Sequence, residues 1–285
     1  MADSDAGIPF LKGHGTENDF VLLPDPDGAL ELTEARVRVL CDRRAGLGAD
    51  GVLRIVRSAS LGEPIGTTAA AEGAEWFMDY RNADGSVAEM CGNGVRVFAG
   101  YLAETGLVAG TEFAVGTRAG IRPVTLSADG QVTVGMGAVR LGGTSSVDLN
   151  GTRYDGVVVD VGNPHLACVT DVDLDTLDLC RAPDHDPATF PHGVNVEFVN
   201  PPRDGVARMR VYERGVGETR SCGTGTVAAA AAVLRSQGRS EGSLVVAIPG
   251  GRVRVDCHDG QATLTGPSVL LAAGELRADW WRSLS

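Results

Sequence analysis

The sequence predicts an α+β fold of two pseudo-symmetric domains, with the active site in the cleft between them. Each domain is expected to be a mostly antiparallel sheet wrapped around a central helix. A Cys-Gly-x-Gly motif occurs at Cys91 and again at Cys222, each after a strand-like run and each opening a helical pattern. Asn82 precedes the first cysteine by nine positions, and Glu213 precedes the second by the same nine, which indicates an internal repeat.

In the first half, the pattern predicts two helices joined by short strands. Thr33 is a cap residue for a helix over 34–43, and a second helix over 95–105 ends at Gly106. Residues 58–74 are rich in Ala, Gly and Thr, and we expect them to form a surface loop outside the site. The expected strands are 9–12, 20–23, 51–56, 76–80, 111–115, 118–126 and 131–136, with a loop over 13–19 between the first two.

In the second half, the helix over 227–235 is apolar almost all round and dominated by alanine, which is typical of a buried helix. Residues 173–179 are acidic and are expected to form a short surface helix. The last segment, 268–281, is expected to return to the first half, so the domains are 1–122 with 268–285, and 123–267. The expected strands are 154–161, 166–170, 195–199, 207–212, 244–248, 253–257 and 262–265.

The net charge of −12 and the pI near 4.8 argue against nucleic acid or an anionic membrane surface as a partner. The polar, acidic start has no apolar signal region, and no apolar run is long enough to span a bilayer. We therefore expect a cytoplasmic protein with reduced thiols.

Several other chemistries are disfavoured. A pyridoxal phosphate enzyme needs a lysine, and the only one is Lys12, beside a glycine near the N-terminus. The five histidines form no paired ligand motif of the kind that binds a structural metal. Residues 46–51 match a dinucleotide fingerprint, but a helix precedes them and a strand follows, the reverse of what that site needs. We expect neither a metal nor a cofactor.

Cys91 and Cys222 are the candidate reactive cysteines. Unpaired backbone N–H groups and the helix dipole lower the pKa of a thiol at the first turn of a helix. One such motif alone is better explained as a glycine turn with a buried cysteine, but a matched pair favours a reactive site. The cysteines expected to be core or surface thiols are Cys41, Cys168, Cys180 and Cys257.

Polar residues at strand ends and turns complete the candidate site. Asparagine favours turns for local reasons, yet four at equivalent ends of two halves are compatible with a shell that binds carboxylates and amines. Glu213 and Arg214 are either a solvated pair or the holders of an ammonium and a carboxylate. His165 is either structural or a group that raises the thiolate fraction, and spacing does not decide between these readings. The four asparagines are Asn18, Asn82, Asn163 and Asn195.

Two opposed thiols can invert an α-carbon of an amino acid without a cofactor. Removal of the α-proton leaves a carbanion that needs delocalisation into its carboxylate, and the N–H groups at two helix starts would stabilise the added charge. One thiolate removes hydrogen from one face, and the opposite thiol delivers a proton to the other.

Taken together, the motifs resemble diaminopimelate epimerase. The matching stretches are GTENDF at 15–20, NADG at 82–85, MCGNG at 90–94, GNPH at 162–165, YERG at 212–215 and SCGTG at 221–225, within a resemblance spanning residues 8–280. This resemblance implies an isomerase independent of pyridoxal phosphate that interconverts LL- and meso-2,6-diaminopimelate for lysine and peptidoglycan synthesis. It also implies a homodimer whose cleft closes on the substrate.

The resemblance assigns roles to individual residues. Cys222 would take the α-proton in the LL-to-meso direction and Cys91 would return one to the other face, with His165 and Glu213 tuning the thiols. Gly51 departs from the family, since many members have Gln there. The implied substrate ligands are Gly92, Asn93, Gly223 and Thr224 for the reacting carboxylate, Asn18, Asn82, Asn163, Asn195 and Arg214 for the two ends, and Glu213 for the amine.

Three alternatives stay open from the residues alone. A proline or hydroxyproline racemase would share the chemistry but would not need the Glu213–Arg214 pair. A redox protein would join Cys91 and Cys222 in a reversible disulfide. A binding protein could keep the fold without catalysis, although retention of both cysteines argues against it.

Overall fold

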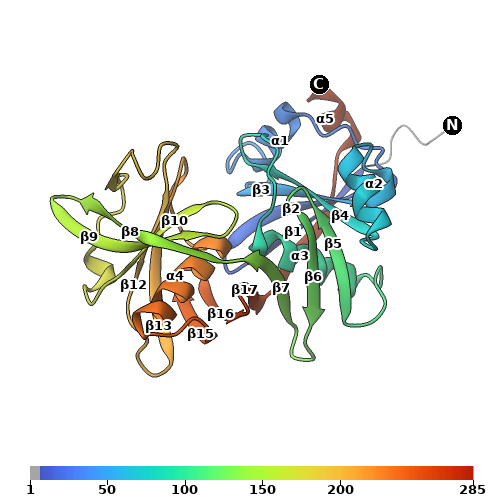
Figure 1. Cartoon of the computed structure of the whole chain (residues 1–285). Coiled ribbons are helices and arrows are strands. Elements are labelled where there is room, and N and C mark those ends of the chain that lie inside the picture. The colour runs from blue at the N-terminus through green and yellow to red at the C-terminus, as the bar shows by residue number, and fades with distance from the viewer. Residues whose placement is uncertain (1–6, 285) are drawn as a thin grey trace. The chain divides into compact units, whose positions relative to one another are not determined.

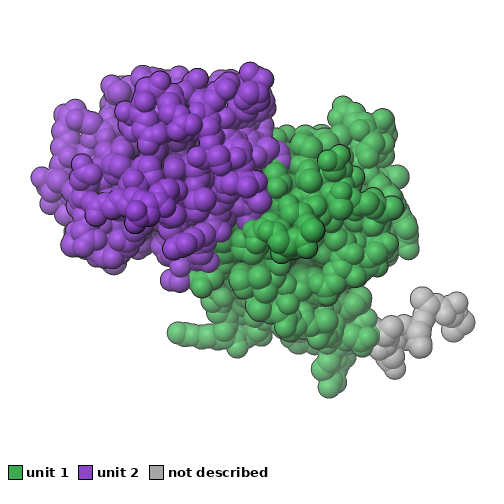
Figure 2. Space-filling view, turned by 90° about the horizontal axis from the view of Figure 1, so that it is seen from below, with its two compact units in different colours: residues 1–134, 267–285 green, residues 135–266 purple. Residues whose placement is uncertain are grey.

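The computed structural model describes residues 7–284, and the chain divides into two compact units (Figures 1 and 2). Unit 1 comprises residues 1–134 and 267–285, and unit 2 comprises residues 135–266. This boundary lies later in the chain than the expected one between residues 122 and 123. The expected cut falls inside β6 (Gly120–Leu126), which is hydrogen-bonded to β5 (Glu112–Thr117) and so belongs to unit 1.

Unit 1 is a sheet around one helix, α3 (Gly92–Glu104), which packs against β1, β2, β3, β4 and β18 (Figure 1). The pairs β2–β3 and β4–β5 are parallel, and the other neighbouring pairs that join β18 through to β7 are antiparallel. The strands in spatial order are β18 (Val269–Leu276), β1 (Ile8–Gly15), β2 (Asn18–Pro24), β3 (Gly51–Arg57), β4 (Trp76–Asn82), β5, β6 and β7 (Gln131–Ala138), the last of which runs across the unit boundary.

Unit 2 repeats this arrangement around α4 (Gly223–Ser236), drawn in orange in Figure 1. The pairs β10–β12 and β13–β15 are parallel, and the other neighbours in the series are antiparallel. The strands in spatial order are β8 (Arg140–Leu149), β9 (Thr152–Asp160), β10 (Pro164–Val169), β12 (Asn195–Val199), β13 (Val206–Glu213), β15 (Gly242–Ile248), β16 (Gly251–His258) and β17 (Gln261–Pro267); short β11 (Asp184–His185) and β14 (Gly217–Thr219) pair at the side of β8 and β13.

The two units share one pairing order, which confirms the predicted pseudo-symmetric α+β fold. From β1 in unit 1 and from β9 in unit 2, successive pairs run antiparallel, parallel, antiparallel, parallel and antiparallel. In both units the central helix enters between the fourth and fifth strands of that series. Each cysteine motif therefore occupies the same topological position.

The central helices are buried because of their composition. In α4 every residue from Val227 to Leu234 is buried, and the alanines allow strands to approach from several sides. In α3 the apolar residues Val95, Phe98 and Leu102 are fully buried. Both helices are followed by a glycine with positive φ, Gly106 at 68° and Gly238 at 73°, which ends the helix in the left-handed region.

The outer helices cover unit 1, and one of them corrects the sequence prediction. Thr33 caps α1 (Glu34–Cys41) as expected, accepting a bond from the N–H of Arg36. The expected loop over 58–74 is wrong, because it contains the short 3-10 helix η1 (Ser58–Ser60) and α2 (Pro64–Ala71). Pro64 at the first helical position and the three alanines at the end of the segment favour a helix, and Ala69 packs in one cluster with Phe77.

Three smaller expectations also differ. The loop expected over 13–19 is wrong, since β1 and β2 extend into it and leave only Thr16 and Glu17 as a turn, with φ of 51° and 62°. Strand β8 was not predicted, because its Gly-Gly and Thr-Ser-Ser segments lack apolar alternation. The helix expected over 173–179 is reduced to the 3-10 turn η2 (Leu174–Thr176). In contrast, the final segment returns to unit 1 as expected, as β18 and α5 (Ala278–Ser283).

Candidate active site

Cys91 is the N-cap of α3, and its sulfur is held by the first turn of that helix. The N–H of Gly94 points at Sγ over 3.4 Å. The thiol in turn donates to Oδ1 of Asn18 over 3.4 Å, and the side-chain amide of Asn93 donates to the same oxygen over 3.3 Å. Three predicted site residues from two distant segments thus meet at one point of unit 1.

Asn18 is fixed in place by a network of charged residues at the β1–β2 turn. Its amide nitrogen donates to Oδ2 of Asp50 over 2.9 Å, and Arg43 donates to Asp50 and to Asp19. Lys12 pairs with the carboxylate of Asp19. The only lysine of the chain is therefore engaged in this network.

Asn82 ends β4 and donates to the hydroxyl of Ser86 over 3.0 Å, within the turn that leads to Cys91. Its strand partner is Gly51, the position at which the chain departs from the resemblance. A Cβ atom at Gly51 would lie 2.6 Å from Cε2 of Tyr80 and 2.5 Å from the carbonyl oxygen of Arg81. The ring of Tyr80 thus fills the space into which a side chain at position 51 would project.

Cys222 repeats the geometry of Cys91 in unit 2. It is the N-cap of α4, and the N–H of Gly225 points at Sγ over 3.4 Å. The hydroxyl of Thr224 lies 3.6 Å from Sγ and accepts a bond from the amide of Asn163 over 3.5 Å. Thr224 and Asn163 therefore correspond to Asn93 and Asn18 in unit 1.

Behind Cys222 lies a buried chain of polar groups that includes one residue absent from the predicted site, Glu197. Nδ1 of His165 is 2.7 Å from Oε1 of Glu197, and Nε2 of the same ring is 2.9 Å from Oδ1 of Asn163. His165 and Glu197 are both fully buried. An acid between the apolar residues Val196 and Phe198 of β12 is the signal that could have identified Glu197.

The remaining predicted residues lie at the ends of β12 and β13. Asn195 pairs with His165 in the β10–β12 ladder, and its side-chain oxygen accepts the backbone N–H of Arg214 over 2.9 Å. The guanidinium of Arg214 is exposed and donates to the carbonyl of His192, while Glu213 accepts a bond from the hydroxyl of Thr219. These residues line one end of the sheet in unit 2.

The expected lowering of the thiol pKa is wrong for Cys222. Burial raises the pKa of this thiol well above its usual value, and the negative charges of Glu213 and Glu197 raise it further. The N–H of Gly225 and the hydroxyl of Thr224 act in the opposite direction but do not outweigh burial. Loss of water around the sulfur therefore dominates over the effect of the helix terminus.

The other cysteines are core or surface thiols, as predicted. Cys41, Cys168 and Cys257 are buried, and Cys180 is exposed. Within residues 7–284, the groups that could together ligate a metal are Glu241, His258 and Asp259, which are exposed and form ordinary surface ion pairs.

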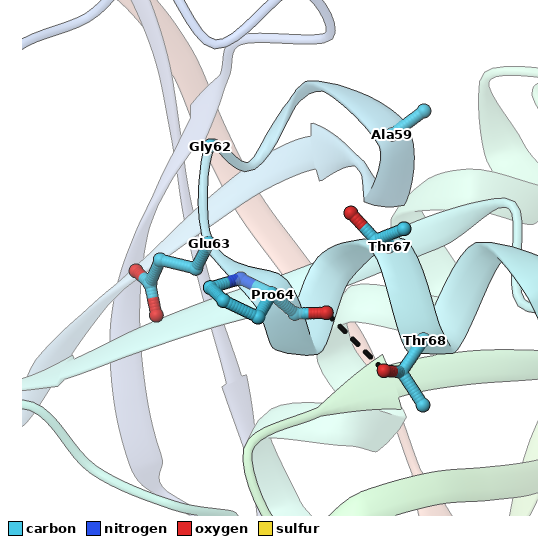
Figure 3. A pocket seen from close by; sticks show the side chains of 6 residues that line it. All are labelled: Ala59, Gly62, Glu63, Pro64, Thr67 and Thr68. Carbon is cyan, nitrogen blue, oxygen red and sulfur yellow. Dashed lines mark hydrogen bonds between the residues drawn. The ribbon is translucent and has the colours of Figure 1, made fainter.

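A surface hollow of about 550 Å³ lies beside α2 (Figure 3). None of its lining residues belongs to either cysteine motif. It is lined by Ala59, Gly62, Glu63, Pro64, Thr67 and Thr68. Its one charged group, Glu63, pairs with Arg118 over 2.6 Å, and Thr68 bonds back to the carbonyl of Pro64. Those interactions are structural, so the hollow is not a candidate active site.

Comparison with known proteins identifies the family. The model of the diaminopimelate epimerase family matches residues 10–142 and 157–271. The chain belongs to the diaminopimelate epimerase family. It is 57% identical to the diaminopimelate epimerase of Rhodococcus opacus (strain B4), over 98% of this chain and 100% of that protein. It is also 57% identical to that of Thermobifida fusca (strain YX), over 94% and 97% of the two chains.

The protein is therefore an isomerase that converts LL-diaminopimelate to the meso form in lysine biosynthesis. The fold is shared with more distant proteins. A Bacillus anthracis phenazine biosynthesis protein of the PhzF family superposes with a TM-score of 0.68 at 17% identity, covering 95% of this chain and 99% of that one. A hydroxyproline epimerase from Agrobacterium vitis gives 0.64 at 15% identity, covering 95% and 92%. No helix within residues 7–284 is long and apolar enough to cross a membrane.

Proposed function

We propose that Cys222 and Cys91 are the two acid–base groups of this epimerisation. In the LL-to-meso direction, the Cys222 thiolate takes the α-proton, and the electron pair of the broken C–H bond moves into the substrate carboxylate. The S–H bond of Cys91 then breaks and its proton forms the new C–H bond on the opposite face. The observation that carries this proposal is the repeated geometry, since each sulfur is the N-cap of the central helix of its unit.

The charge that develops on the carboxylate needs donors that are already in place. The backbone N–H groups of Gly92 and Asn93, and of Gly223 and Thr224, lie in the first turns of α3 and α4, at the positive end of each helix dipole. Such N–H groups stabilise an anion without reorganising during the reaction. We assign the reacting carboxylate to these two helix starts.

The other polar residues are assigned to the two ends of the substrate. Asn18 and Asn163 lie beside the two cysteine motifs, where they can orient the reacting centre. The exposed guanidinium of Arg214 suits bidentate contact with the distal carboxylate, with Asn82 and Asn195 as further ligands and Glu213 for the amine. The reaction is proposed to use no cofactor, because two thiols and two helix starts supply every proton and charge that it needs.

Single-cysteine variants test this assignment. We expect Cys91→Ala and Cys222→Ala each to lose more than about a thousandfold in kcat, because each removes one of two obligatory proton carriers. Cys180→Ala removes an exposed thiol and serves as the matched control with unchanged turnover. Near-native turnover in either active-site variant, with a native circular dichroism spectrum, would refute the two-base assignment.

We also propose a cytoplasmic homodimer that serves both lysine and peptidoglycan synthesis, on the basis of the family resemblance. Sedimentation equilibrium at micromolar concentration is expected to give twice the chain mass of 29.5 kDa. A single species at the mass of one chain would contradict the dimer.

A further inference from the structure

The two cysteine motifs share a backbone geometry but differ in the buried charge beside them. In unit 1, Arg96 lies on α3 one turn beyond the motif, and it is completely buried. In unit 2, the fully buried group beside the motif is the acid Glu197 on β12. The two fully buried groups beside the cysteine motifs are therefore of opposite charge type.

The guanidinium of Arg96 has neutral partners only. Nε donates to the carbonyl of Pro267 over 3.2 Å, Nη2 donates to the hydroxyl of Thr16 over 3.1 Å, and Nη1 has no hydrogen-bond partner among the described residues. A Cβ atom built on Gly15 would lie 3.0 Å from Nη2 of Arg96 and 3.0 Å from the carbonyl oxygen of Asn93. Because both atoms are close to the same point, the Arg96 cation lies beside the first turn of α3. A buried cation without a carboxylate is costly unless a nearby group supplies negative charge.

Glu197 has the opposite effect on Cys222. A Cβ atom at Gly225 would lie 2.7 Å from Oε1 of Glu197 and 3.2 Å from Sγ of Cys222, so the carboxyl group and the sulfur flank one glycine. Oε2 of Glu197 has no hydrogen-bond partner among the described residues. Glu197 loses its proton at about pH 7, so a thiolate at Cys222, which forms only at higher pH, would be a second anion in this dry region.

The surrounding charges leave this contrast in place. The charged groups near α3 form ion pairs with one another. Around α4, the groups that act on Cys222 are Glu197 and Glu213, and the ring of His165 is bonded to Glu197. The paired groups near α3 are Lys12 and Arg43 with Asp19 and Asp50, and Arg54, Arg81 and Arg118 with Asp79; Glu275 at the far end of β18 is exposed.

We propose that these opposite buried charges make the two thiols ionise in a fixed order, with Cys91 losing its proton at a lower pH than Cys222. Arg96 and Glu197 are positioning residues that set this order without touching the substrate. The attraction between Arg96 and a Cys91 thiolate is also seen in the pKa of Arg96. Burial lowers this pKa to about 10, and an ionised Cys91 raises it. The inference rests on the proposed role of both cysteines, and it makes Cys91 the first of the two thiols to ionise in the free enzyme.

Site-resolved alkylation tests the order directly. The reduced protein is treated with iodoacetamide between pH 5 and pH 10, and the rate at each cysteine is measured by peptide mass spectrometry. Because the thiolate is the nucleophile, the midpoint pH of each rate reports the ionisation of that thiol rather than its accessibility. We expect the Cys91 midpoint to lie about one pH unit or more below that of Cys222, whose rate should still be rising at pH 10 because burial raises its pKa well above the usual value. A lower midpoint at Cys222, or equal midpoints, would overturn the proposal.

Variants separate the two buried charges. Arg96→Gln is expected to raise the Cys91 midpoint alone, Arg96→Lys to restore it in part, and Glu197→Gln to lower the Cys222 midpoint alone. If Arg96→Gln fails to fold, the wild-type order and Glu197→Gln still decide the matter. Loss of turnover in the single-cysteine variants concerns the proposed function and does not depend on the order of ionisation, so failure of one proposal is distinguishable from failure of the other.

Discussion

Nδ1 of His165 lies 2.7 Å from Oε1 of Glu197, and both side chains are completely buried beneath the Cys222 motif. The same ring reaches Asn163 through Nε2, and Asn163 in turn donates to Thr224. A predicted thiol-tuning histidine thus does not bond to sulfur. It connects a buried acid to two residues that we assign to the substrate.

The first prediction concerns Glu197. Burial raises the pKa of Glu197 to about 7, so the folded state holds a proton that the unfolded state releases above about pH 4.5. The stabilisation that results is fully present below the unfolded pKa and is lost as pH rises through the folded pKa. We therefore expect the melting temperature of the wild type to fall between pH 5 and pH 8. The melting temperature of Glu197→Gln is expected to fall less over the same range. Glu104→Gln, an exposed acid on α3, is the control that should follow the wild type. Equal slopes in wild type and Glu197→Gln would contradict this account.

The second prediction concerns the hydroxyl of Thr224. Thr224→Val keeps the shape but removes the group that lies 3.6 Å from Sγ of Cys222 and accepts the amide of Asn163. We expect kcat to fall about tenfold, which corresponds to about 1.4 kcal/mol, with little change in melting temperature. Thr67→Val in the exposed part of α2 is the control, and an unaltered kcat in Thr224→Val would exclude a role for this hydroxyl.

The third prediction concerns Gly51. A methyl group there would meet the ring of Tyr80 and the carbonyl of Arg81 within 2.6 Å, so Gly51→Ala is expected to destabilise the fold by about 1–3 kcal/mol. Gly143→Ala is the matched control, since a Cβ atom at that strand position meets nothing within 4 Å. Urea unfolding measures both variants. Equal stability in the two would show that Tyr80 does not occupy the space at position 51.

The fourth prediction concerns Asp79, which is fully buried in unit 1 and bonded to Arg81 and Arg118. Burial alone would raise the pKa of Asp79, but these two cations hold it below its usual value. Its contribution to stability is present above the unfolded pKa and is lost as pH falls through the folded pKa. Asp79→Asn is expected to cost about 1–3 kcal/mol at pH 7, because it leaves half-buried Arg81 without a counter-charge, whereas Arg118 keeps its ion pair with Glu63. Denaturant unfolding at pH 7 checks this value, and a cost below about 1 kcal/mol would show that the arginines find other partners.

Much of the architecture follows from local pattern. The two Cys-Gly-x-Gly motifs, the alanine-rich run and the apolar strands predicted the helices and the repeat, because those features depend on periodicity and capping within a few residues. The residues near each cysteine that we assign to the substrate were also identified from the sequence, since they recur at strand ends in both halves.

What the pattern did not predict depends on tertiary contact. The sequence of α2 is rich in small residues, as a loop would be, and the helix is stabilised by the packing of Ala69 in the cluster of Phe77. Strand β8 forms because it pairs with β9, since its own composition does not favour a strand. Glu197 and Arg96 are ordinary charged residues in sequence, and only burial shows that one lies under each cysteine motif with opposite sign. The raised pKa of Cys222 could not be predicted from the sequence either, because the burial that causes it depends on how the whole unit packs.

The most direct test of the two-base account is the isotope content at early conversion of LL-diaminopimelate in heavy water, read by proton NMR and mass spectrometry with no added cofactor. The account predicts that the meso product carries one solvent deuterium at the inverted α-carbon, while recovered LL substrate keeps its protium, because different sulfurs remove and deliver the proton. Product that retains the substrate's own proton at that carbon would mean that a single base serves both faces, and it would contradict the central claim.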